Sequence, residues 1–211
     1  MVVQLFTFNP VQENTYLLYD ETKACIIIDA GCYTSQEQDA LLHFIEQKSL
    51  SVKRILNTHG HFDHVFGNAF LAKHFGLLPE GHQADEVFID TMESYTKAFG
   101  FTQGVFPQKM GGYLSEGDKI VFGNTELIAI HVPGHSPGSL CYYCEKDGVL
   151  FSGDVLFKSS IGRTDLLGGD FAALINGITE KLVSLPDQTV VYPGHGPATT
   201  IGYEKINNPY L

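Results

Sequence analysis

The sequence predicts a mixed α and β domain with two strand-rich halves flanked by helices. Strands and helices are interleaved along the chain, and each half begins with strands and ends in a strand-helix unit. The composition, with 44% hydrophobic and 18% charged residues, is typical of a globular protein. At about 150 residues per domain, the 211 residues fit one domain, 1–211, better than two.

In the first half, short β-branched and aromatic segments separated by turns predict strands. Ser35 and Gln38 have the spacing of a capping box, and apolar residues recur at helical spacing through about Lys48. The expected strands are 2–8, 15–19, 25–29 and 52–57, and the expected helices begin near 35, 68 and 84, the last ending near 99.

In the second half, strands are expected at 120–122, 126–132, 139–145, 149–152 and 189–192, and a helix at 171–185. Nothing in the sequence indicates export, so we expect its four cysteines, Cys25, Cys32, Cys141 and Cys144, to be free thiols. Cys141 and Cys144 form a C-x-x-C within an aromatic-rich strand. Because no second C-x-x-C exists, we expect a strand here, not a redox pair or half of a zinc site.

The net charge of -11 argues against a nucleic-acid surface and against docking on anionic lipid. No apolar stretch approaches the roughly 20 residues of a membrane span, and the start has no basic segment or cleavage site. These features predict a cytoplasmic protein. The oligomeric state is not predicted by any feature of the sequence.

The segment Thr58-His59-Gly60-His61-Phe62-Asp63-His64 directly follows a predicted strand. Alternation in extended backbone places His59 and His61 on one side, and Gly60 lets the chain bend between them. Asp63 and His64 lie where the next helix starts, so their side chains can turn toward the same point. Imidazole nitrogens with carboxylate oxygens suit zinc, iron or manganese.

Three single candidate ligands follow later strands: His135, Asp154 and His195. Each has a glycine immediately before it, where the backbone can approach a metal without an intervening side chain. Together with the first segment, five histidines and two aspartates provide enough donors for two metal ions.

In this order, five motifs resemble those of the metallo-β-lactamase superfamily of hydrolases over nearly the whole chain. They are Ile28-Asp29-Ala30-Gly31, the T-H-x-H-x-D-H loop, Gly134-His135, Ser152-Gly153-Asp154 and Gly194-His195-Gly196. The resemblance implies an α+β fold, an αββα four-layer sandwich with the site at one edge between the sheets. It also implies that His59, His61 and His135 bind one metal, that Asp63, His64 and His195 bind the other, and that Asp154 bridges them. Asp29 would hold the histidine loop.

Gly153–Phe157 and Ile161–Asp165 are similar to the glyoxalase II (hydroxyacylglutathione hydrolase) branch, and most similar to its small single-domain bacterial members. Residues 196–211 follow the last candidate ligand, so we expect no counterpart of the C-terminal helical domain of longer members, and less glutathione-specific binding. The resemblance implies two divalent metal ions, with zinc favoured and iron or manganese as alternatives. A metal-bridging hydroxide would attack a small-molecule thioester, with Asp63 and Asp154 as catalytic residues.

Two other activities fit the same motifs. A related branch contains glutathione persulfide dioxygenases, in which His59, His135 and Asp154 would hold a single iron, and a lactone hydrolase would use the same hydroxide on an ester. Arg163, and more weakly Lys158, are candidates to bind a substrate carboxylate. We expect four aromatic residues to belong to the core and not to a lid: Tyr95, Phe99, Phe101 and Phe106. Four histidines outside glycine loops are expected not to be ligands: His43, His74, His82 and His131.

Overall fold

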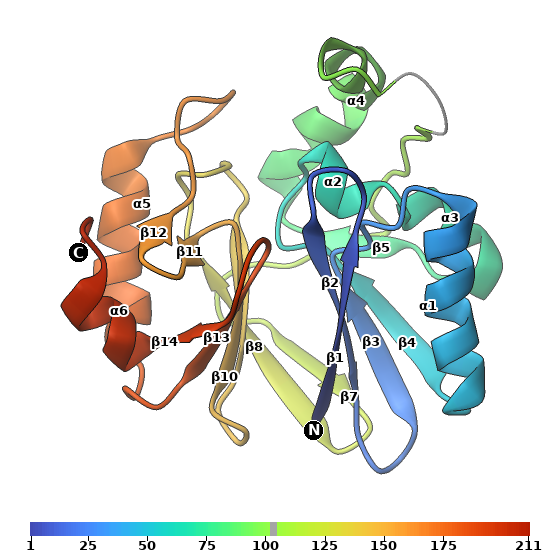
Figure 1. Ribbon diagram of the computed structural model, residues 1–211, viewed down its shortest axis with the longest axis horizontal. Helices are drawn as coiled ribbons and strands as arrows, with labels where there is room; N and C mark the ends of the chain where they lie inside the picture. The colour runs from blue at the N-terminus through green and yellow to red at the C-terminus, as the bar shows by residue number, and fades with distance from the viewer. Residues whose placement is uncertain (102–104) are drawn as a thin grey trace.

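The computed structural model describes residues 1–101 and 105–211, and two β-sheets face each other at its centre (Figure 1). The first sheet has the strand order β1-β2-β3-β4-β5-β6. Its strands are β1 (Val2–Phe8), β2 (Glu13–Tyr19), β3 (Ala24–Ile28), β4 (Ser51–Leu56), β5 (Pro79–Gly81) and β6 (Gly112–Tyr113). Strands β1 to β3 are antiparallel, and β3 to β6 are parallel.

The second sheet has the order β14-β13-β10-β9-β8-β7, and β11 and β12 form a separate hairpin. These strands are β7 (Lys119–Phe122), β8 (Thr125–His131), β9 (Leu140–Cys144), β10 (Val149–Gly153), β11 (Leu156–Phe157), β12 (Ser160–Ile161), β13 (Val190–Pro193) and β14 (Thr199–Thr200). Strands β10 and β13 are parallel, so their carboxyl ends lie at the same edge of the sheet.

Helices cover the outer face of each sheet, which gives the expected αββα order of layers (Figure 1). The helices are α1 (Ser35–Gln47), α2 (Phe62–Val65), α3 (Asn68–Phe75), η1 (Gln83–Asp85), α4 (Glu86–Ala98), α5 (Phe171–Gly177), the π-helical turn η2 (Ile178–Leu182) and α6 (Ile201–Asn207). No helix in the described parts of the chain is both long and apolar enough to cross a bilayer. The cytoplasmic location stays a prediction.

The side chains of a strand alternate between its two faces, so the strands contribute to three apolar layers: one between the sheets and one between each sheet and its helices. In β3, Ile26 and Ile28 face the opposite sheet, whereas Cys25 and Ile27 pack against α1 and α3. In β9, Tyr142 likewise faces the opposite sheet, where its hydroxyl donates to Asn57 O at 2.7 Å. Because both faces of these strands are covered, their sequences are nearly continuous apolar runs.

Most of the expected elements are confirmed, with ends shifted by one or two residues. The capping box of α1 lies one residue earlier than expected: Thr34 is the N-cap and Glu37 closes the box. The expected helix 171–185 divides into α5 and the π-helical turn η2. Strands of two or three residues, such as β5, β6 and β14, were not expected, because so short a segment has no detectable alternation.

Candidate metal centre

The seven candidate ligands lie together at one edge of the two sheets, five of them in loops and Asp63 and His64 in the short helix α2. The segment after β4 supplies four of them, and α2 begins at Phe62, so Asp63 and His64 occupy its first turn. The loop between β8 and β9 supplies His135. Asp154 directly follows β10, and His195 comes two residues after the end of the parallel strand β13. The two sheets therefore contribute four and three of these residues.

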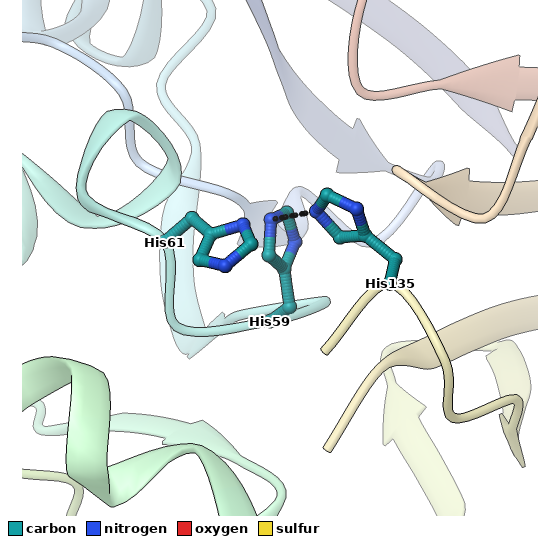
Figure 2. A group of neighbouring side chains, drawn as sticks. All are labelled: His59, His61 and His135. Carbon is teal, nitrogen blue, oxygen red and sulfur yellow. Dashed lines mark hydrogen bonds between the residues drawn. The ribbon is translucent and has the colours of Figure 1, made fainter. Parts of the chain in front are cut away.

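Three histidines form the first group (Figure 2). The rings of His59, His61 and His135 are 4.6–4.7 Å apart between centroids, and all three side chains are buried. The Nε2 atoms of His59 and His135 are 3.2 Å apart. One nitrogen from each of the three rings lies within 4.8 Å of the other two, a spacing at which they can bind one metal ion.

Asp63, His64 and His195 form the second group. Oδ2 of Asp63 lies 3.2 Å from His195 Nε2 and 3.6 Å from His64 Nε2. This group mixes imidazole with carboxylate, and His195 is its most exposed member, at 27%. It is therefore the side of the centre that faces solvent.

The carboxylate of Asp154 lies between the two groups. Its Oδ1 is 3.4 Å from His64 Nε2, and its Oδ2 is 3.6 Å from His135 Nε2 and 3.7 Å from His195 Nε2. One carboxylate thus contacts histidines of both groups.

Four of the five imidazoles are fixed through the nitrogen that points away from the centre. His59 Nδ1 lies 3.0 Å from Thr58 Oγ1, and His64 Nδ1 lies 3.0 Å from Asp29 Oδ2. Backbone carbonyls hold the other two, Arg163 O for His135 and Gln12 O for His195, at 2.9 and 3.2 Å. These contacts leave Nε2 of each ring facing the centre, the arrangement that orients metal-binding histidines.

The donor set fits divalent metal ions. His61 Nε2, His64 Nε2 and Asp154 Oδ1 are buried and have no hydrogen-bond partner among the residues that the structure describes. Buried polar atoms are normally paired, because an unpaired one costs about 1–3 kcal/mol. Metal ions at this point would satisfy all three atoms.

The electrostatics of the cluster favour a bound cation. Burial lowers the pKa of His59 well below its usual range and, with the nearby His135, lowers that of His61 to about 3, so both rings are neutral and their lone pairs are available. Burial alone would lower the pKa of His64, but the surrounding carboxylates raise it well above its usual value. The carboxylates therefore stabilise positive charge at the position of His64 Nε2.

Sequence comparison matches residues 8–195 to the family model of the metallo-beta-lactamase superfamily. The chain belongs to the metallo-beta-lactamase superfamily. It is 35% identical to the hydroxyacylglutathione hydrolase GloC of Haemophilus influenzae, over the whole chain and 98% of that relative.

Two solved structures of the superfamily are similar over nearly their whole length. TTHA1623 in a di-iron-bound form has a TM-score of 0.88 and 37% identity, covering 99% of this chain and all of that one. The B3 metallo-beta-lactamase BLEG-1 has a TM-score of 0.86 and 36% identity, covering 100% and 99%. The fold expected from the motifs is thus confirmed.

A pocket of about 220 Å³ opens onto the metal centre. Besides candidate ligands, five apolar or aromatic side chains line the pocket, those of Val11, Phe62, Tyr95, Phe99 and Leu166. Arg163 also lines it, with its side chain 57% exposed and its guanidinium paired to Asp165 through contacts of 2.7 and 2.8 Å. Lys158 instead lines a neighbouring pocket of about 320 Å³, which shares only His195 with the first.

The aromatic residues expected in the core divide into three environments. Phe101 packs against Tyr33, Phe62 and Phe66, as expected. Tyr95 and Phe99 line the pocket. The expectation is wrong for Phe99 and Phe106, which are 50% and 67% exposed: Phe99 is the C-cap residue of α4, and Phe106 lies beyond the end of that helix.

The cysteines are free thiols as expected, and the remaining four histidines lie apart from the candidate ligands. The metal-ligand groups formed by described residues contain none of the four histidines His43, His74, His82 and His131. The rings of His82 and His131 stack on each other, with their centroids 4.2 Å apart. All four cysteines are buried free thiols, and burial raises the pKa of Cys141 far above its usual value, so Cys141 is not a reactive thiol.

Two buried carboxyl groups beside the centre were missed from the sequence. Glu13 is fully buried, 3.9 Å from His64 Nδ1, and burial raises its pKa well above the usual range. Asp85 is fully buried beneath the histidine loops. Neither residue lies in a pattern that marks it from the sequence: Glu13 precedes the expected strand 15–19, although β2 begins with it, and Asp85 lies in a polar segment.

Gly194 provides a test of how tightly the ligand loops pack in the superfamily fold. A Cβ here would lie 2.7 Å from His64 Cε1 and directly against Asp154 Oδ1. We predict that Gly194→Ala lowers the free energy of unfolding by about 1–3 kcal/mol, the usual cost of overpacking, measured by urea denaturation. Gly112→Ala is the control, since its Cβ would meet Glu80 Oε2 at an ordinary 3.4 Å. Equal small changes in both variants would contradict the packing described.

Proposed function

We propose that this chain is a binuclear metal-dependent hydrolase that cleaves a thioester of the hydroxyacylglutathione type. The position of Asp154 carries the proposal, because its carboxylate contacts histidines from two complete ligand groups. The likeness to GloC supports the substrate class. Two complete groups favour a binuclear hydrolase over a single-iron dioxygenase, which would use only His59, His135 and Asp154.

In this proposal His59, His61 and His135 hold one ion, and Asp63, His64 and His195 hold the other, with Asp154 shared. When bound, divalent ions lower the pKa of water from 15.7 to about 7 and polarise a carbonyl oxygen. Zinc is favoured by the histidine-rich donors, with iron and manganese as alternatives. Asp63 Oδ2, near the mouth of the pocket, is placed to accept a hydrogen bond from the attacking water and orient it.

The remaining pocket residues bind and shield the substrate. The apolar wall excludes water from the acyl group, which strengthens electrostatic interactions there. Arg163, at the same pocket, is placed to bind an anionic end of the thiol portion. The group that leaves when the thioester C–S bond breaks is a thiolate. Because a thiolate is stable as an anion, the site needs no general acid to protonate it.

The function is tested by assaying purified protein loaded with zinc, iron or manganese against S-lactoylglutathione, a lactone and a penicillin. Thiol release from S-lactoylglutathione, well above the other two activities, is expected. A penicillin belongs in the panel because of the likeness to BLEG-1. Oxygen consumption with glutathione persulfide in the iron form, without thiol release from the thioester, would contradict the proposal.

Asp154→Ala should abolish thioester hydrolysis and reduce bound metal to about one ion or fewer per chain, because one carboxylate serves both sites. The loss should exceed that of His64→Ala, which removes a ligand from one group only. The two variants are compared by their metal content, measured by inductively coupled plasma mass spectrometry, and by their rate of thioester hydrolysis. A variant that keeps two ions and full activity would show that Asp154 does not bridge.

Arg163→Ala should lower kcat/KM for S-lactoylglutathione by about 5- to 30-fold, corresponding to about 1–2 kcal/mol for an exposed charge-assisted contact. The loss should be in KM, because a contact made equally in ground and transition states does not slow chemistry. Asp165→Ala is the control, since it frees the guanidinium and should not raise KM. If Arg163→Ala slows a neutral thioester equally, Arg163 is structural and recognition moves to Lys158.

A further inference from the structure

Asp85 lies directly beneath two of the candidate ligand loops. It ends η1 and precedes α4, and its side chain is fully buried. Its Oδ2 accepts hydrogen bonds from Gly60 N at 2.8 Å and from Ser136 Oγ at 2.7 Å. Its Oδ1 accepts one from Gly138 N at 2.6 Å. Gly60 separates His59 from His61, and the other two donors, Ser136 and Gly138, follow His135 in its loop.

The loops pack on Asp85 without spare room. A Cβ at Gly60 would lie 2.8 Å from Asp85 O, and one at Gly138 would lie 2.7 Å from Asp85 Oδ1. Burial raises the pKa of the Asp85 carboxyl, and its three donors act in the opposite direction. A buried carboxylate is tolerated here because it replaces water as the partner of two backbone N–H groups and a hydroxyl.

We infer that Asp85 is a positioning residue that fixes the His59–His61 loop against the His135 loop and so preforms the three-histidine metal site. This inference rests on the proposed function, which assigns a metal ion to the three histidines. Of the three histidines, two come from the loop after β4 and one from the loop after β8, so their spacing depends on how the two loops are held together. Asp85 joins them through a single carboxylate.

The chemistry of the carboxylate makes the role specific. Each of its two oxygens serves a backbone N–H from a different loop. An Asn side chain has the same shape but only one oxygen, so in Asp85→Asn its NH₂ group must face either Gly60 N or Gly138 N. One loop therefore loses its anchor in either orientation, although the volume is unchanged.

Asp20 offers a matched control at the far end of β2. It is also buried, and its Oδ1 and Oδ2 accept backbone N–H groups from two different loops, those of Thr22 and Asn124, at 2.9 and 2.6 Å. Its loops carry no candidate ligand. Asp20→Asn therefore breaks the same kind of contact without reaching the metal centre.

The experiment compares zinc affinity, by chelator competition, in the full-length wild type, Asp85→Asn and Asp20→Asn. Asp85→Asn should weaken zinc binding by about 10- to 100-fold, the usual effect of removing a group that orients ligands, and Asp20→Asn by less than about twofold. In the metal-free protein, amide exchange at Gly60 or Gly138 should accelerate by about 10-fold only in Asp85→Asn. Ser136→Ala, which removes one donor and keeps the carboxylate, should weaken zinc binding less and replaces Asp85→Asn if that variant does not fold.

Unchanged zinc affinity in Asp85→Asn, or equal losses in both Asn variants, would overturn the inference and leave the proposed function standing. Tight zinc binding by the wild type without thioester hydrolysis would overturn the proposed function alone, because the Asp85 comparison is read from affinity and amide exchange. A wild type that binds no zinc, iron or manganese would overturn both.

Discussion

Five imidazoles and two carboxylates converge at one largely buried point, and the arrangement of the surrounding chain follows from the need to hold them there. Groups of this kind repel or stay hydrated unless each has a partner. The fold provides partners on the outer side: a threonine, an aspartate and two backbone carbonyls fix four Nδ1 atoms. The inner nitrogens remain directed at a common centre, which cations would satisfy.

The same constraint couples the two halves of the chain, because neither sheet carries all the ligands. Hydrogen bonds join the two sheets at the edge that carries the candidate ligands. Asn14 Nδ2 donates to Pro193 O and Gly196 O, on either side of His195. The Tyr142 hydroxyl donates to Asn57 O, just before the histidine loop. Asp29 accepts from Thr58 N and Thr58 Oγ1 and so fixes the start of that loop. A substitution that breaks one of these contacts is therefore expected to displace candidate ligands without removing any of them.

Much of this was predictable from sequence, for reasons visible in particular residues. His59, His61, Asp63 and His64 are dense and follow a clear strand, while His135, Asp154 and His195 each follow a strand and a glycine. Of the groups that support the ligands, Asp29 was expected from the resemblance, whereas Asp85 and Glu13 were not. Asp85 and Glu13 act through tertiary contacts with residues more than 15 positions away, and the pairing of Arg163 with Asp165 depends on side-chain rotamers. Such contacts cannot be predicted from the pattern of neighbouring residues in the sequence.

An anomalous difference map, recorded at the zinc absorption edge from crystals of the zinc-loaded protein, shows directly how many ions the seven residues hold. Two peaks per chain are expected, one among His59, His61 and His135 and one among Asp63, His64 and His195, with the Asp154 carboxylate in contact with both. A single peak bound by the first group and Asp154, with Asp63, His64 and His195 unligated at saturating zinc, would contradict this expectation.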